Sequence, residues 1–113
     1  MKKLLILIFG ALLFGSCSNA LYKYYDYDNL LYAYGTRDFN EREIKRFSRQ
    51  YAKIVDSPKG KRKLPPPGAC VEYALLLFQQ GKTKEAKEYL IKETVYYPES
   101  QTYVDSIVKK LGL

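Results

Sequence analysis

The sequence predicts an all-α protein: a small helical domain in which a helix-turn-helix is flanked by an N-terminal helix and a C-terminal capping helix. Three observations predict this fold class. Apolar residues recur at the three- and four-residue spacing of an amphipathic helix in four separate segments. Glycine or proline residues stand between these segments, where helices end. The 113 residues have room for a single domain.

The first predicted helix covers residues 40–56. Asn40 followed by Glu43 is typical of a capping box at a helix N-terminus. One face of this helix carries the apolar residues Ile44, Phe47, Tyr51, Ile54 and Val55. Residues 57–67 are interpreted as a basic, proline-rich linker. Its last residue, Pro67, can start the next helix because proline suits the first helical position.

The helix-turn-helix follows, with helices over 68–80 and 83–97 and a turn at Gly81. Thr83 is a plausible cap for the second of them. The apolar face of the first helix is expected to contain Cys70, Tyr73, Ala74, Leu77 and Phe78. The apolar face of the second helix is expected to contain Ala86, Tyr89, Leu90, Thr94 and Tyr97. After Pro98, a last helix over 100–111 is expected to bury Tyr103, Val104, Ile107, Val108 and Leu111.

Residues 1–16 have the parts of a bacterial secretion signal. Two lysines precede an apolar run over 4–14, which is too short for the ~20 residues that a membrane-spanning helix needs. The order Phe14-Gly15-Ser16-Cys17 resembles the lipobox of bacterial lipoproteins, with phenylalanine where leucine is usual. This resemblance implies cleavage before Cys17 and its acylation. The alternative is an ordinary secretory signal with an incidental cysteine.

A lipidated Cys17 would anchor the chain to a membrane, since each buried CH₂ group contributes ~0.8 kcal/mol. By resemblance to the common sorting rule, the absence of aspartate after Cys17 favours the outer membrane, with the protein facing the periplasm. Residues 17–39 would then form a Tyr-rich entry segment before the domain at 40–113. Its tyrosines are expected either to pack on the domain or to lie at the membrane interface.

Residues 67–100 resemble one tetratricopeptide (TPR) repeat, a helical hairpin of ~34 residues. The positions that fit are Ala74, Gly81, Ala86, Leu90 and Pro98. The chain departs from the repeat at Cys70, where a bulky aromatic residue is usual, at Leu77, where tyrosine is usual, and at Glu93, where alanine is usual. A single repeat cannot bury both of its faces. The helices over 40–56 and 100–111, or a partner, are therefore expected to cover them.

A wider resemblance covers nearly the whole chain beyond the signal. It is carried by the segments LYKYYDYDNLLYAY, LPPPGACVEYALLLFQQGKTKEAKEYLIKE and YYPESQTYVDSIVKKL. Together these are similar to a family of small periplasmic lipoproteins classed as domain of unknown function 4810. The resemblance implies a lipoprotein encoded near curli-secretion-type outer-membrane lipoproteins, and it implies no activity. Family members often have a tryptophan near Tyr24 and Tyr25, which this chain lacks.

The residue types argue against an enzyme. The chain has no histidine, which excludes histidine-based triads and histidine-containing metal sites. Cys70 lies on an apolar helix face, where a buried packing thiol is expected. Glu85, Glu88 and Glu93 alternate with lysines and are interpreted as a solvated, charged face. No glycine-rich phosphate loop occurs. We therefore expect no catalytic residue, metal, cofactor or small-molecule substrate.

The net charge of +7 is concentrated in one segment. Residues 37–63 contain ten basic and four acidic residues, whereas residues 64–113 contain six of each. Export makes nucleic acid a poor partner for this segment. Anionic lipid head groups, acidic cell-wall groups and an acidic partner protein remain as candidates. The alternative is a solvated linker without a ligand.

These observations favour a non-enzymatic adaptor that binds an envelope protein. The expected contact residues are Tyr73, Phe78 and Tyr89, together with Lys61 and Arg62. The alternative function is a lipoprotein that binds cell wall or anionic lipid through residues 37–63. A purely structural lipoprotein is a third possibility. Attachment through charge should weaken steeply with salt, whereas an apolar contact should not.

Overall fold

The computed structural model describes residues 2–3, 32 and 40–113 of the chain. In this part there are four α-helices and no β-strand: α3 (Glu41–Asp56), α4 (Ala69–Gln79), α5 (Thr83–Tyr96) and α6 (Gln101–Leu111), with a short 3-10 helix, η1 (Pro98–Ser100). The predicted all-α fold class is therefore confirmed. The lipobox, Cys17 and all of the Tyr-rich segment except Tyr32 lie outside the described residues.

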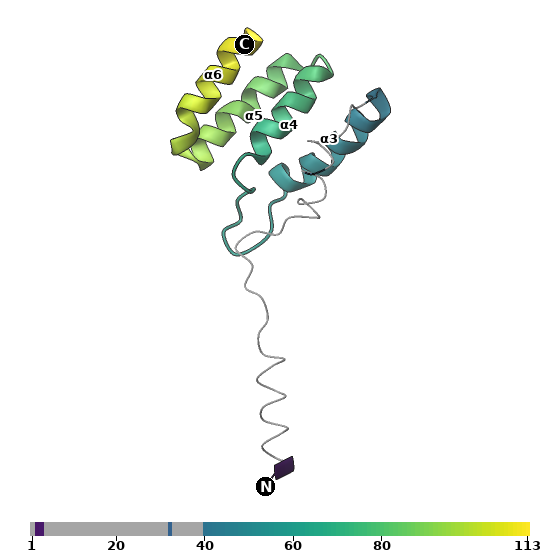
Figure 1. The fold of residues 1–113 in the computed structure, drawn as a ribbon, viewed down its shortest axis with the longest axis vertical. Coiled ribbons are helices and arrows are strands. Elements are labelled where there is room, and N and C mark those ends of the chain that lie inside the picture. The colour runs from purple at the N-terminus through teal and green to yellow at the C-terminus, as the bar shows by residue number, and fades with distance from the viewer. Residues whose placement is uncertain (1, 4–31, 33–39) are drawn as a thin grey trace.

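Figure 1 shows the four helices side by side in chain order, each packed on the next. α4, α5 and α6 are roughly aligned, whereas the axis of α3 diverges from that of α4. None of the helices in the described ranges has both the length and the apolar character to cross a membrane.

Helix α3 begins as the sequence predicts. The Asn40 side chain accepts a hydrogen bond from the Glu43 backbone N–H at 2.9 Å, and the Asn40 N–H donates to the Glu43 carboxylate at 3.3 Å. This reciprocal capping box satisfies two amide groups that the helix itself cannot pair. Further along, the predicted apolar stripe is buried at Phe47, Tyr51, Ile54 and Val55, and half-buried at Ile44.

Helix α4 is the centre of the domain, because α3 packs on one side of it and α5 on the other. It is therefore buried on more than the single face that the sequence predicts, with Ala69, Val71 and Leu76 fully enclosed beside Cys70, Ala74 and Leu77. The prediction that Pro67 starts this helix is wrong. Gly68 precedes the first helical residue with a φ of 92°, a backbone conformation that glycine adopts without strain.

The proline-rich end of the predicted linker is part of the core. Pro65 is fully buried, and its carbonyl oxygen accepts a hydrogen bond from the Tyr97 hydroxyl at 2.6 Å. Tyr97 follows α5, so this bond joins Pro65 to the far end of the hairpin. Only the first part of the 57–67 segment, which carries the basic residues, is an exposed loop.

Two predictions for the last two helices are wrong. Thr83 lies inside α5, and Lys82 precedes the helix without a capping side-chain bond. Tyr103 is 60% exposed, because α6 contacts α5 on one side and no further described helix covers its other side. Val104, the next residue, is the one that α6 buries completely. α6 ends at Gly112, whose φ of 70° forms a left-handed cap.

Candidate functional site

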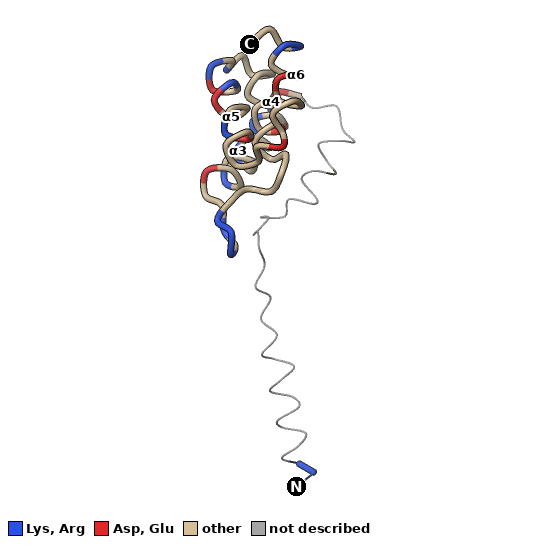
Figure 2. Tube along the Cα trace, turned by 90° about the vertical axis from the view of Figure 1, so that its left-hand side faces the viewer, with Lys and Arg blue, Asp and Glu red and all other residues tan. Residues whose placement is uncertain are grey.

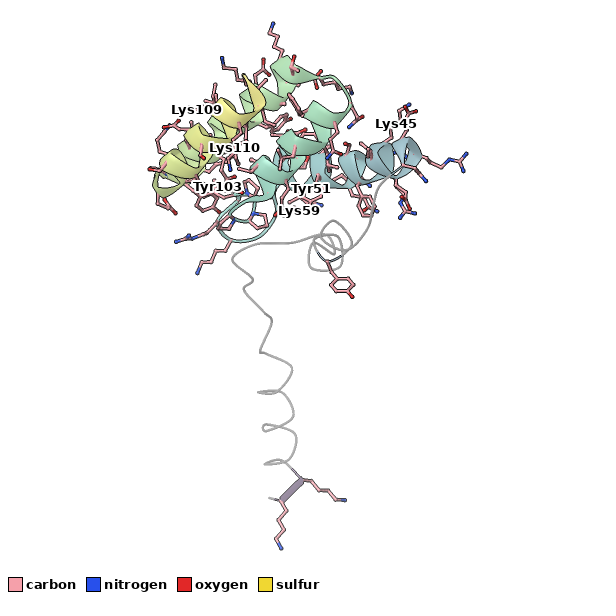
Figure 3. The ribbon with its side chains drawn as sticks, turned by 45° about the horizontal axis from the view of Figure 1, so that its top comes forward. Lys45, Tyr51, Lys59, Tyr103, Lys109 and Lys110 are labelled. Atoms are coloured by element: carbon pink, nitrogen blue, oxygen red, sulfur yellow. The ribbon has the colours of Figure 1, made fainter. Side chains whose placement is uncertain are left out.

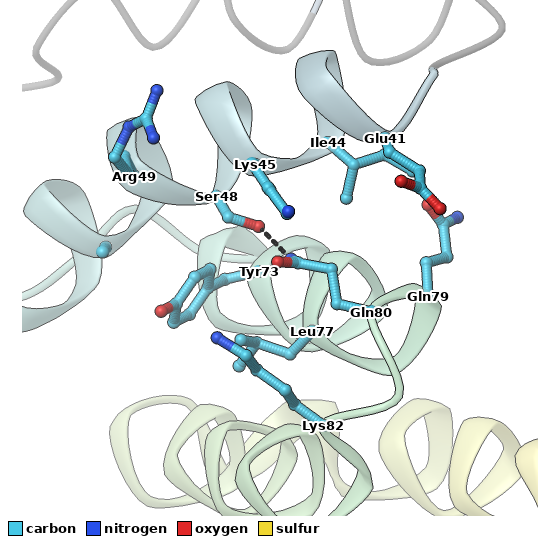
Figure 4. Close-up of a pocket in the computed structure, with 11 residues that line it drawn as sticks. Glu41, Ile44, Lys45, Ser48, Arg49, Tyr73, Leu77, Gln79, Gln80 and Lys82 are labelled. Carbon is cyan, nitrogen blue, oxygen red and sulfur yellow. Dashed lines mark hydrogen bonds between the residues drawn. The ribbon is translucent and has the colours of Figure 1, made fainter.

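An open groove of about 590 Å³ lies between α3 and the C-terminal end of α4 (Figure 4). It forms because α3 diverges from α4 toward its own N-terminus (Figure 1). Apolar lining comes from Ile44, Ala52, Tyr73 and Leu77. Charged lining comes from Glu41, Lys45, Arg49 and Lys82. The remaining lining residues are Ser48, Gln79 and Gln80. We call this feature the α3/α4 groove.

Hydrogen bonds between side chains set the angle between the two walls of the groove. The Gln80 side-chain amide donates to the Ser48 hydroxyl at 2.6 Å, across the groove itself (Figure 4). About one turn further along α3, the Tyr51 hydroxyl donates to the Glu72 carboxylate at 2.8 Å. These bonds join α3 to α4 and to the residue that follows it, so hydrogen bonds as well as packing fix how the two sides of the groove lie.

The aromatic pair Tyr73 and Tyr89, two of the predicted contact residues, is brought together by the fold. Their ring centroids are 4.6 Å apart at an interplanar angle of 78°, an edge-to-face geometry. The Tyr89 hydroxyl donates to the Asp56 carboxylate at 2.5 Å, and the Lys92 ammonium lies 4.3 Å from the Tyr89 ring centroid. Burial raises the pKa of both tyrosines. The pair thus links α5 to the end of α3, and Tyr73 also lines the groove.

The other predicted contact residues lie elsewhere. Phe78 is half-buried in the last turn of α4, against the core. Lys61 and Arg62 are exposed in the loop that leads into the first turn of α4. A helix of this length separates its two ends by about 15 Å. The five predicted residues therefore do not form one continuous surface, although Tyr73 and Tyr89 are in contact.

Sequence analysis included Lys45 and Arg49 in the basic segment 37–63, but it did not bring them together with Lys82, which lines the same groove. It did not consider which side of their helix Lys45 and Arg49 share. The signal that could have found them is their spacing: four residues apart, they share one side of α3. Which neighbour that side faces depends on the angle between helices, which the sequence does not contain.

Glu93 corrects the prediction of a solvated acidic face on α5. It is only 2% exposed, and one carboxylate oxygen accepts a hydrogen bond from the Gly68 backbone N–H at 2.7 Å. It follows Ala86 and Leu90 on the same helix face, which packs against the start of α4. The other carboxylate oxygen, Oε2, is buried without a hydrogen-bond partner. Glu93 therefore acts as the acceptor at the N-terminus of α4, where Gly68 has no side chain to provide one.

Cys70 is fully buried in the adjacent turn and forms no disulfide, which confirms the expectation of a buried thiol. Desolvation, followed by the charge of Glu93, raises the pKa of the Cys70 thiol to about 12. A raised pKa favours the protonated thiol, which is a weaker nucleophile than the thiolate.

The pH dependence of stability is expected to report on Glu93. Burial raises the pKa of the Glu93 carboxyl above its ordinary value of 4.5, and the hydrogen bond from the Gly68 backbone opposes this only in part. The folded state then binds a proton more tightly than the unfolded state. The free energy of unfolding should therefore fall as the pH rises from the ordinary carboxyl pKa, which applies in the unfolded state, through the raised pKa of the folded state. Glu93→Gln, which keeps the acceptor oxygen, should remove this decrease.

The measurement is urea unfolding at a series of pH values, followed by circular dichroism. Glu88→Gln is the matched control, since Glu88 is exposed on the same helix. The difference between wild type and Glu93→Gln should change with pH, whereas the difference between wild type and Glu88→Gln should stay constant. Equal pH profiles for Glu93→Gln and wild type would contradict the prediction.

Within the described ranges, no group of three or more His, Cys, Asp or Glu side chains is arranged to hold a metal ion. The features that remain are a defined groove with an apolar floor and charged walls, and an exposed basic loop. Together they define a small helical protein whose described surface has a groove and an exposed basic loop.

The family of the chain is shown by comparison. The model of the family described as Domain of unknown function (DUF4810) matches residues 21–107. This match covers most of the chain, and the protein belongs to this family. No curated protein and no solved structure matches the chain.

Proposed function

We propose that the protein is a non-enzymatic adaptor lipoprotein, lipidated at Cys17 and held in the cell envelope at the periplasmic face of the outer membrane. Its α4–α5 hairpin is TPR-like. Ala74 and Ala86 are buried where the two helices meet, and Gly81 takes a φ of 78° in the turn between them. Pro98 follows the second helix, as in the repeat.

The observation that carries the proposal is the α3/α4 groove. Binding clefts combine apolar walls with a few placed polar groups. The groove has both, on the facing sides of α3 and α4 (Figure 4). The candidate partner is a curli-secretion-type outer-membrane lipoprotein. This choice rests on the family resemblance described in the sequence analysis.

Photo-crosslinking in intact cells tests this function. A photoreactive amino acid is placed at Ala52 or Gln79, which line the groove, and at Tyr103 on α6 as the matched exposed control. We expect one envelope protein to be captured from the two groove positions and not from Tyr103. Capture should fall when Cys17→Ala removes the anchor. Equal yields from all three positions would argue against a groove-specific partner.

A second candidate function rests on the basic loop (residues 59–63). Lys59, Lys61, Arg62 and Lys63 are all exposed there, and Figure 2 shows their segment at one end of the domain. The loop is closed by a hydrogen bond from the Lys63 N–H to the Gly60 carbonyl at 3.3 Å. Such a turn gathers cations that suit anionic lipid or cell wall. Figure 3 shows Lys59 in this loop well apart from Lys45 of the groove.

The two functions respond differently to charge reversal. Lys61→Glu with Arg62→Glu should release cell-wall or lipid fragments if the basic loop is the binding site, and these fragments should also be released by salt. The same variant should leave crosslinking from Ala52 unchanged if the groove is the site.

A further inference from the structure

The α3/α4 groove carries an excess of positive charge that the described part of the chain does not neutralise. Lys45 and Arg49 stand on α3, and Lys82 stands on the opposite side, in the turn between α4 and α5. Within the described ranges, the side chains of these three residues make no ion pair and no hydrogen bond. The groove has one acidic lining residue, Glu41, against these three cations.

The cations lie on both sides of an apolar floor. Lys45 and Arg49 are four residues apart and therefore about 6 Å apart along α3. Figure 4 shows Lys45 reaching from α3 toward α4, and Lys82 lying on the other side beside Tyr73 and Leu77. A ligand on this floor would have cations on both of its flanks, so carboxylates on either side of it would be attracted.

The apolar floor of the groove favours a peptide over a small anion as the ligand. Ile44, Ala52 and Leu77 offer apolar contact between the charged positions, which a phosphate or a sulfate would not use. The Gln79 side-chain amide lies at one rim and can pair with a peptide backbone. The combination fits a protein segment in which acidic and apolar residues alternate.

Charge also orients the bound segment. Glu41 lies one turn before Lys45 on α3, at the end of the groove next to Gln79 (Figure 4). It repels carboxylates there, whereas Lys45, Arg49 and Lys82 attract them further along. The acidic residues of the ligand therefore lie toward Lys45 and Lys82, and its neutral or basic end lies toward Glu41.

We propose that the α3/α4 groove binds an acidic peptide segment of its protein partner, in which at least two carboxylates flank an apolar residue. This inference rests on the adaptor function proposed above and names the chemistry of the partner. It places the contact in the groove and not in the basic loop.

The test pans a library of random heptapeptides on phage against the purified full chain. Enriched peptides are then synthesised with a fluorescent label, and binding is measured by anisotropy. We expect the enriched sequences to carry two or more Asp or Glu residues around an apolar residue. Lys45→Glu with Lys82→Glu should weaken binding by about tenfold or more, because two attractive pairs become repulsive.

Lys61→Glu with Arg62→Glu is the matched control, since it makes the same change in net charge outside the groove. Binding within about twofold of wild type is expected for it. An equal loss in both variants would show attraction by net charge alone and would overturn the proposal. Enrichment of neutral or basic peptides, or of none, would overturn it as well.

The crosslinking experiment keeps this inference separate from the adaptor function. If a partner is captured from Ala52 but the crosslinked segment contains no acidic residues, the adaptor function stands and the acidic-segment inference fails. If no partner is captured from either groove position, the adaptor function itself fails.

Discussion

Replacing Leu90 by alanine is expected to lower the free energy of unfolding by about 3 kcal/mol. Leu90 is completely buried on α5, on the face that packs against α4. Truncation removes its apolar contacts and leaves a cavity that the two helices cannot close without losing other contacts. Urea unfolding of the purified protein, followed by its helical circular-dichroism signal, measures the change.

Ile91→Ala is the matched control for this change. Ile91 is the next residue on the same helix, loses the same kind of side chain, and is 53% exposed. Its replacement should change the free energy of unfolding by less than about 1 kcal/mol. Similar losses for the two variants would mean that α5 does not pack on α4 through the Leu90 face.

Replacing Glu93 by alanine is expected to lower the free energy of unfolding by about 2–3 kcal/mol. The variant removes the oxygen that accepts the Gly68 N–H at 2.7 Å and leaves that amide without its partner at the start of α4. It also creates a void, since Glu93 is only 2% exposed. Removing the unpaired Oε2 also removes an unfavourable burial, but this gain offsets only part of the lost free energy of unfolding. Chemical unfolding at neutral pH measures the difference.

Two further variants separate the hydrogen bond from the charge. Glu93→Gln keeps an acceptor oxygen and most of the volume, so it should be clearly more stable than Glu93→Ala. Glu88→Ala, on the exposed face of the same helix, should have little effect. If Glu93→Ala proved as stable as Glu88→Ala, the buried acceptor would have no role in the fold.

Local features were predictable wherever a short stretch of chain contains the whole interaction. The capping box of Asn40 and Glu43 is such a case, because both of its partners lie within one turn. The left-handed cap at Gly112 is another. The ends of the helices also follow from local signals, since Gly81 and Pro98 stand where α4 and α5 end. The apolar stripe of α3 was predictable because helical period alone selects the buried side.

The candidate site was predictable only in part. The contact between Tyr73 and Tyr89 follows from two apolar faces of one hairpin, and the sequence indicated both faces. The groove could not be predicted, because it depends on the angle at which α3 leaves α4. That angle is held by bonds between distant residues, such as Gln80 to Ser48.

The sequence by itself determined the helical class of this protein, the order of its helices and most of their limits, because these depend on spacing and on residues within one turn of each other. The tertiary structure alone decided the burial of Glu93 and the exposure of Tyr103. Glu93 is enclosed because the start of α4 lies against it and needs an acceptor. Tyr103 stays exposed because no described helix covers that side of α6. The surroundings of Glu93 depend on a segment that is remote in the chain. Those of Tyr103 depend on whether another helix of the described part packs beside α6. Helical period predicts neither of these.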